Sequence, residues 1–214
     1  MQTCIIMTVI GFLSGSVMYS YIIPRLFKKV DVRSAARDKN PGGANAIAAT
    51  GVFIGVTCTA LDILKAFVPV FLSAAYMGVS GLFLLPVMIA PVLGHAFSPF
   101  LWFKGGKALS VSFGTLLGIF WVSKAIVLLI IILLIFKFLV VVTPDSSLIV
   151  ASFVICAMAV LFLEPLIAVK AGMIVISAVV CLKHLLNPNG AETAVRVGHF
   201  AVRYEDKGIK FGRK

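Results

Sequence analysis

The sequence predicts an all-α fold, a polytopic integral membrane helix bundle with about seven transmembrane helices. Of the 214 residues, 61% are hydrophobic, whereas soluble globular domains contain roughly 45–50% apolar residues. Only 13% of the residues are charged, and they cluster between long apolar blocks. One soluble core of this length cannot bury so much apolar surface, so we expect lipid to surround most of the chain.

Long apolar blocks give the candidate membrane spans, because a helix needs about 20 apolar residues to cross a bilayer. The fourth and sixth of the seven blocks are shorter than the others. Either can be a re-entrant or half-buried helix, so the predicted range is five to seven spans. The blocks are residues 4–23, 51–75, 81–103, 108–121, 125–142, 148–163 and 165–182.

The positive charges predict how these helices are oriented. The net charge is +11, from 19 Lys and Arg against 8 Asp and Glu. The cations concentrate in the loop 25–39, at Lys104 and Lys107, and in the tail from Lys183 onward. Seven spans with an outside N-terminus place all three regions in the cytoplasm, where the loops of membrane proteins are enriched in Lys and Arg.

The two ends of the chain differ in character. No cation precedes the first apolar block, unlike the basic start of a signal peptide, so we expect this block to be an uncleaved helix. We predict a membrane-embedded domain over 1–187 and a basic cytoplasmic tail over 188–214. The weak alternation in the tail allows a short hairpin, a segment on the lipid headgroups, or partial disorder.

Several function classes lack their sequence signatures here. An excess of basic over acidic residues can indicate nucleic-acid binding. No basic segment here carries a recognisable binding motif, so we expect no nucleic-acid partner. The four cysteines lie in apolar blocks without CxxC spacing, and we expect neither a metal nor a cofactor. The GxSxG motif is absent. So is the His-x-x-x-x-Asp dyad of many glycerolipid acyltransferases, because Phe100 stands five places after His95.

The first cationic loop has the composition of an anion site. Asn40 and Asn45 supply amide donors, and the glycines at 42 and 43 let backbone amides approach a ligand. The residues after Gly43 can begin a helix whose N-terminus faces the anion. The alternative is an ordinary Pro-Gly turn between two helices.

The second cationic loop reads Phe103-Lys104-Gly105-Gly106-Lys107, with two glycines between two lysines. This composition suits a phosphate at the membrane surface. The alternative is a flexible turn whose lysines mark the cytoplasmic side.

Two further pairs have helical spacing. Asp62 and Lys65 lie three residues apart inside an apolar block, where ionisable groups are costly and suggest function, although they can also form a structural ion pair. His184 and Asn187 have the same spacing at the end of the last block. That histidine can bind an anion or move a proton, or simply cap a helix at the surface.

In these segments the chain resembles the bacterial acyl-phosphate:glycerol-3-phosphate acyltransferases, the PlsY family, over about residues 11–187. The strongest match is Gly94-His95 followed by Phe103-Lys104-Gly105-Gly106-Lys107. The other segments similar to family motifs are Ser14-Gly15-Ser16, Asn40-x-Gly42-x-x-Asn45, Leu61-Asp62-x-Leu64-Lys65 and Lys183-His184-x-x-Asn187.

Two positions in the first motif depart from the family pattern. The family has a Ser where this chain has Asp38, and an Arg where it has Ala48. Both family residues are associated with substrate phosphate. Arg33, Arg37 or Lys39 is a candidate replacement for the missing cation; alternatively, the acceptor has changed or activity has been lost.

The resemblance implies that acyl phosphate donates its acyl chain to the 1-hydroxyl of glycerol 3-phosphate, giving lysophosphatidic acid for phospholipid synthesis. His184 and Lys104 are then expected to be catalytic. Asp62, Lys65 and His95 would support the site. Substrate and phosphate binding would fall to Asn40, Gly42, Asn45, Gly105, Gly106, Lys107 and Asn187.

The implied location is the bacterial inner membrane, with the active site on its cytoplasmic face. The partners would be the two substrates, membrane lipids and the soluble enzyme that forms acyl phosphate. Two alternatives stay open: a family relative that acylates another phosphate-bearing acceptor, and a non-enzymatic small transporter that uses Asp62 and Lys65.

Overall fold

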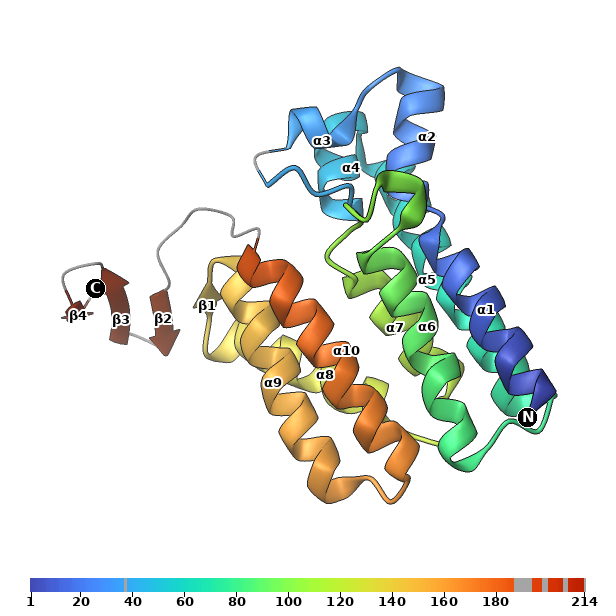
Figure 1. The fold of residues 1–214 in the computed structure, drawn as a ribbon. Coiled ribbons are helices and arrows are strands. Elements are labelled where there is room, and N and C mark those ends of the chain that lie inside the picture. The colour runs from blue at the N-terminus through green and yellow to red at the C-terminus, as the bar shows by residue number, and fades with distance from the viewer. Residues whose placement is uncertain (37, 187–193, 198–199, 206–207, 214) are drawn as a thin grey trace.

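The computed structural model describes residues 1–36, 38–186, 194–197, 200–205 and 208–213. Helices dominate this part of the chain and pack side by side as a bundle (Figure 1). The α-helices are α1 (Gln2–Ser16), α2 (Tyr19–Lys28), α3 (Val32–Ala35), α4 (Gly43–Thr50), α5 (Val52–Ala75), α6 (Leu84–Ala96), α7 (Leu109–Gly118), α8 (Ala125–Leu134), α9 (Asp145–Leu163) and α10 (Ile167–Leu186). The short helical segments are η1 (Gly81–Phe83), η2 (Pro99–Leu101) and the π-helix η3 (Ile135–Leu139).

Five helical segments of the described chain are long enough and apolar enough to cross a membrane, judged by length and composition. Two shorter apolar helices, Leu109–Gly118 and Ala125–Leu139, accompany them. This confirms the predicted range of five to seven spans. The fourth block is short, as expected, but the sixth is not: α9 has 19 residues, because it begins at Asp145 and includes polar residues before the apolar run.

The first apolar block is broken where the sequence predicted one continuous helix. The helix α1 ends at Ser16 and α2 begins at Tyr19. The break leaves the Val17 carbonyl outside any helical ladder, where it accepts a short hydrogen bond from the Lys65 ammonium group. The break thus supplies a backbone acceptor to a buried cation.

Glycines allow the helices around this break to approach closely. A Cβ atom at Gly15 would overlap the backbone of Pro91, and one at Gly94 would overlap the Phe12 carbonyl. Small residues at such crossings let helix backbones touch in a membrane. Meanwhile Ile5, Ile6 and Val9 on α1 stay more than half exposed, as expected for side chains that face lipid.

A small antiparallel sheet follows the bundle. It has the order β1-β2-β3-β4 and comprises β1 (Val142–Thr143), β2 (Ala194–Val197), β3 (Phe200–Glu205) and β4 (Gly208–Arg213). The strand β1 precedes α9 and pairs with β2 from the tail. Of the three alternatives for the tail, the structure therefore favours hairpin pairing. The all-α class is confirmed, and only the pairing of the tail with β1 was not predicted, because a two-residue strand beside long apolar runs leaves no pattern.

The loops expected to carry chemistry gather at one end of the bundle. Figure 1 places α2, α3 and α4 at that end, with the N-terminus at the opposite end. The helix α10 packs against both α9 and α6, and its last turn reaches the same region as α4. The helices thus bring together loops that are far apart in the sequence.

Candidate active site

The loop before α4 is organised around the carboxylate of Asp38. Its Oδ1 accepts hydrogen bonds from Asn45 Nδ2 at 2.8 Å and from the Asn40 backbone amide at 3.2 Å. The Asn45 amide also donates to the Asn40 carbonyl at 2.9 Å. Gly42 leaves room for the Asn40 side chain, which a Cβ at that position would crowd. The helix predicted after Gly43 is present as α4.

The second loop joins the first through an ion pair. Lys107 Nζ lies 2.8 Å from Asp38 Oδ2, and only 8% and 10% of the two side chains are exposed. Burial raises the pKa of the Asp38 carboxyl, but hydrogen bonds from Lys107 and Asn45 outweigh it and hold the pKa below its ordinary value. Sequence analysis identified each loop separately and did not predict this ion pair. The acidic residue at position 38 was the single feature of the sequence that could have indicated it.

Two glycines fix the second loop against His95. The backbone amide of Gly106 donates to the His95 carbonyl at 3.0 Å. A Cβ at Gly105 would overlap that carbonyl, and one at Gly106 would overlap the His95 ring. The glycines therefore allow close packing on α6, and the approach of their backbone amides to a phosphate stays a prediction.

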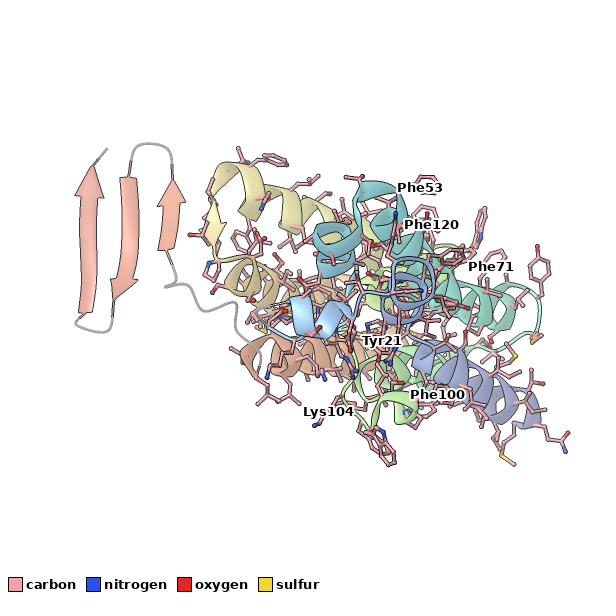
Figure 2. All side chains as sticks on the ribbon, turned by 90° about the horizontal axis from the view of Figure 1, so that it is seen from above. Tyr21, Phe53, Phe71, Phe100, Lys104 and Phe120 are labelled. Atoms are coloured by element: carbon pink, nitrogen blue, oxygen red, sulfur yellow. The ribbon has the colours of Figure 1, made fainter. Side chains whose placement is uncertain are left out.

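Lys104 lies apart from this cluster. Its side chain is exposed, follows the exposed residues Trp102 and Phe103, and does not line the cavity described below. Figure 2 shows Lys104 and Phe100 at the edge of the molecule. Of the two lysines expected at the phosphate, the structure thus places Lys107 in the site and Lys104 outside it.

A buried hydrogen-bonded network supports the second loop from behind. The ammonium group of Lys65 has three partners: Asp62 Oδ1 at 2.7 Å, the Val17 carbonyl, and His95 Nδ1 at 3.0 Å. The hydroxyl of Ser20 donates to Asp62 Oδ2 at 2.6 Å. One ion pair and two hydrogen-bond contacts thus surround the ammonium group, which offsets the cost of burying its charge.

His184 lies in the last turn of α10 and reaches the same site. Its Nδ1 lies 2.9 Å from the Val180 carbonyl. Because a carbonyl can only accept, Nδ1 carries a proton, and Nε2 is the basic nitrogen of the neutral ring. The side chain is buried and lines the cavity. Asn187 and Arg37 lie outside the described residues.

These groups line an open cavity of about 840 Å³. One side is polar and comprises Asp38, Asn40, Gly42, Asn45, Lys107 and His184. The wall from α8, η3 and the start of α9 is mainly apolar, with Leu133, Leu134, Phe138, Leu148 and Ile149. This wall could not be predicted from the sequence, because its residues resemble any lipid-facing run.

The same wall carries a second polar group. Lys137 and Asp145 form an exposed ion pair at 2.9 Å, and the buried Ser146 hydroxyl has no hydrogen-bond partner in the described part of the chain. All three residues line the cavity. Of the possible replacement cations, Arg33 is held by Asp31 at 3.3 Å and by the Tyr21 hydroxyl at 2.9 Å, and it does not line the cavity.

The arrangement can hold a molecule that has an anionic head and an apolar chain. Lys107, Asn40 and His184 present polar groups to the head, while the wall from α8 to α9 presents an apolar surface to the chain. The His184 Nε2 can accept a proton from a hydroxyl bound at the polar side. The cavity therefore suits chemistry on an amphiphilic, phosphate-bearing substrate.

The chain is similar to known proteins. Residues 5–190 match the family described as glycerol-3-phosphate acyltransferase. The glycerol-3-phosphate acyltransferase 2 of Thermotoga maritima is 41% identical over 113 residues, which are 53% of this chain and 57% of that relative. A glycerol-3-phosphate acyltransferase of Leptospira borgpetersenii is 39% identical over 109 residues, half of each chain. This chain thus spans little more than half the length of these relatives.

Solved structures match over more of the chain. The crystal structure of PlsY, an integral membrane glycerol 3-phosphate acyltransferase, in its glycerol 3-phosphate form has a TM-score of 0.76 and 26% identity. The match covers 87% of this chain and 90% of PlsY. The lysophosphatidic acid form has a TM-score of 0.73 over the same shares. This chain is therefore a multi-pass membrane protein that belongs to the glycerol-3-phosphate acyltransferase family.

Proposed function

We propose that the protein transfers an acyl chain from acyl phosphate to the 1-hydroxyl of glycerol 3-phosphate. The products are lysophosphatidic acid and inorganic phosphate, and the product lipid serves phospholipid synthesis. The observation that carries this proposal is the cavity, which joins a polar, amide-rich side to an apolar wall. The two forms of PlsY, with glycerol 3-phosphate and with lysophosphatidic acid, support the same acceptor and product. Family membership speaks against the transporter alternative.

The reaction needs little covalent help from the protein. The acceptor oxygen attacks the acyl carbonyl carbon, the bond from that carbon to the phosphate oxygen breaks, and phosphate leaves. The hydroxyl proton passes to the phosphate or to His184 Nε2. An acyl phosphate is already activated, so positioning and charge stabilisation supply most of the rate.

The site residues divide between these tasks. Lys107 holds phosphate charge. Asn40 and Asn45 orient the acceptor, and Oδ1 of Asn40 has no hydrogen-bond partner in the described chain, which suits a substrate hydroxyl. His184 contacts the acceptor and handles its proton. We keep Lys104 and Asn187 in the proposed site as sequence-based assignments, to be tested by substitution.

We place the site on the cytoplasmic face of the bacterial inner membrane, because the cationic loops then lie on the side that favours Lys and Arg. The acyl phosphate would come from a soluble enzyme on that side. No coenzyme A or carrier protein takes part in the proposed step.

A second candidate function keeps the chemistry but changes the acceptor. The observation that favours it is the ion pair between Asp38 and Lys107, since Asp38 stands where the family motif has a Ser and gives the acceptor side of the cavity different contacts. An assay with several phosphorylated polyols in place of glycerol 3-phosphate separates the two candidates.

The donor assay tests the proposal directly. Purified protein in lipid receives radiolabelled glycerol 3-phosphate with either acyl phosphate or acyl-CoA. We expect lysophosphatidic acid with acyl phosphate alone, and rescue of a bacterial strain that lacks this step. Equal or faster product formation with acyl-CoA would falsify the donor assignment, and no product with either donor would favour another acceptor.

A further inference from the structure

The carboxylate of Asp38 occupies the centre of the polar side of the cavity. It is paired with Lys107 Nζ at 2.8 Å and accepts from Asn45 Nδ2 at 2.8 Å and from the Asn40 amide at 3.2 Å. Only 10% of its side chain is exposed. The same three residues are those proposed to bind the substrates, so a protein anion sits where a substrate anion must bind.

The other carboxylates that line the cavity do not share this position. Asp62 is paired with Lys65 at 2.7 Å, and Asp145 is paired with Lys137 at 2.9 Å. Each acidic side chain of the described lining thus has a lysine partner. The charge of Lys107, the lysine of the polar side, is balanced by Asp38 before any substrate arrives.

An entering phosphate must change these contacts. The Asn45 amide group has two N–H bonds, and both are used, by Asp38 and by the Asn40 carbonyl. A phosphate that takes the donor now given to Asp38 leaves that carboxylate short of a partner. If Asp38 stays in place, two anions share Lys107 and repel each other in a partly buried site.

We propose that Asp38 is a specificity-determining residue that competes with phosphate groups for Lys107 and Asn45, and so weakens phosphate binding. The consequence for catalysis rests on the proposed function. A lower affinity for phosphate groups raises the KM for glycerol 3-phosphate and speeds the release of inorganic phosphate after each transfer. A nearby charge typically shifts a binding equilibrium by about tenfold or more.

Binding of inorganic phosphate tests the competition without turnover. Unfolding temperatures of the purified protein in lipid, measured at rising phosphate concentration, give a dissociation constant for each variant. We expect Asp38→Asn and Asp38→Ser to bind phosphate about tenfold more tightly than the unmodified chain. Adding Lys107→Met to Asp38→Asn should abolish the gain.

Asp31 provides a matched control. It lies in the same loop region and pairs with Arg33 at 3.3 Å, but it does not line the cavity. Asp31→Asn can still cap α3, because asparagine is a good cap residue, and it should leave phosphate binding unchanged. Tighter binding in Asp31→Asn would show a general charge effect and overturn the proposal.

A kinetic comparison separates competition from catalysis. If Asp38 competes with phosphate, Asp38→Asn lowers the KM for glycerol 3-phosphate and does not raise kcat. A loss of kcat by about 100-fold with unchanged phosphate affinity would make Asp38 a base for the acceptor hydroxyl and refute the competitor role. If Asp38→Asn binds phosphate more tightly but neither protein transfers an acyl chain to glycerol 3-phosphate, the proposed function is refuted and the competition between Asp38 and phosphate still holds.

Discussion

The two lysines of the second loop differ in their surroundings although they stand three residues apart. Lys107 is buried, paired with Asp38 and part of the cavity lining, whereas Lys104 is exposed beyond it. We expect Lys107→Ala to lower the transfer rate by about 10²–10³-fold, because a charge aimed at the reacting phosphate is lost. Initial rates in the donor assay measure this.

Lys104→Ala serves as the comparison variant for that measurement. Its exposure predicts a smaller loss than that of Lys107→Ala, and both proteins should fold, as judged by their unfolding temperatures. Equal losses would mean that Lys104 reaches the substrate once it is bound. A Lys107→Ala protein with full activity would remove that residue from the site.

The ion pair between Asp38 and Lys107 also predicts a pH dependence. The pKa of Asp38 lies below its ordinary value of 3.8, so the pair stabilises the fold above that pH and is lost as the pH falls through the folded pKa. The difference in unfolding temperature between the unmodified chain and Asp38→Asn should stay constant from about pH 5 to 8 and shrink at lower pH. A change between pH 6 and 8 would point to a different group.

Residue types and spacing located most of the polar side of the site. Asn40, Asn45, Lys107 and His184 stood out as polar groups between apolar blocks, and all four line one cavity. The pairing of Asp38 with Lys107 could not be predicted, because it joins two loops whose distance depends on helix packing. Lys104 looked equivalent to Lys107 because sequence spacing does not show which side of a turn is buried.

At the scale of the helices, we expect the buried pair on α5 to be architectural. Asp62→Ala or Lys65→Ala leaves one uncompensated charge among apolar helices, which typically costs about 3–5 kcal/mol. Each single variant should therefore lower the folded yield in detergent. Replacing both residues with apolar ones of similar size should restore part of that yield.

The comparison with Lys107→Ala makes this test specific. The Asp38 carboxylate left by Lys107→Ala is more exposed than the charges of the α5 pair, so that variant should lose less folded yield than Asp62→Ala or Lys65→Ala, while it should lose transfer activity. If Asp62→Ala instead folds normally and abolishes function, the pair belongs to the functional centre and our division between architecture and catalysis is wrong.

The lengths of the apolar blocks predicted which segments are helices better than they predicted where each helix begins and ends. The fourth block is short in both sequence and structure, as α7, while the sixth became the full-length α9 because polar residues extend it. At the break between α1 and α2, the Val17 carbonyl accepts a hydrogen bond from Lys65. Such a contact between distant segments has no signal in the local pattern.

For the whole molecule, the distribution of cations predicts the topology. Reporter fusions after Lys39, Lys107 and Lys214 should all report a cytoplasmic location, because seven spans with an outside N-terminus put these regions on one side. A fusion after Tyr76 should report the opposite side and serves as the control. A periplasmic signal at any of the first three positions contradicts this map.

The three partners of Lys65 also set an order for building the protein in the membrane. Two of them, Val17 and Asp62, are synthesised before the lysine itself, and His95 follows on α6. An unpaired lysine in the centre of a helix costs roughly 2.5–3.5 kcal/mol on insertion. Because Asp62 lies one turn earlier on α5, the two charges can compensate each other when that helix leaves the insertion machinery. The arrival of α6 then supplies the last acceptor, so the step that completes the buried network also brings the Gly105–Gly106 loop to its place.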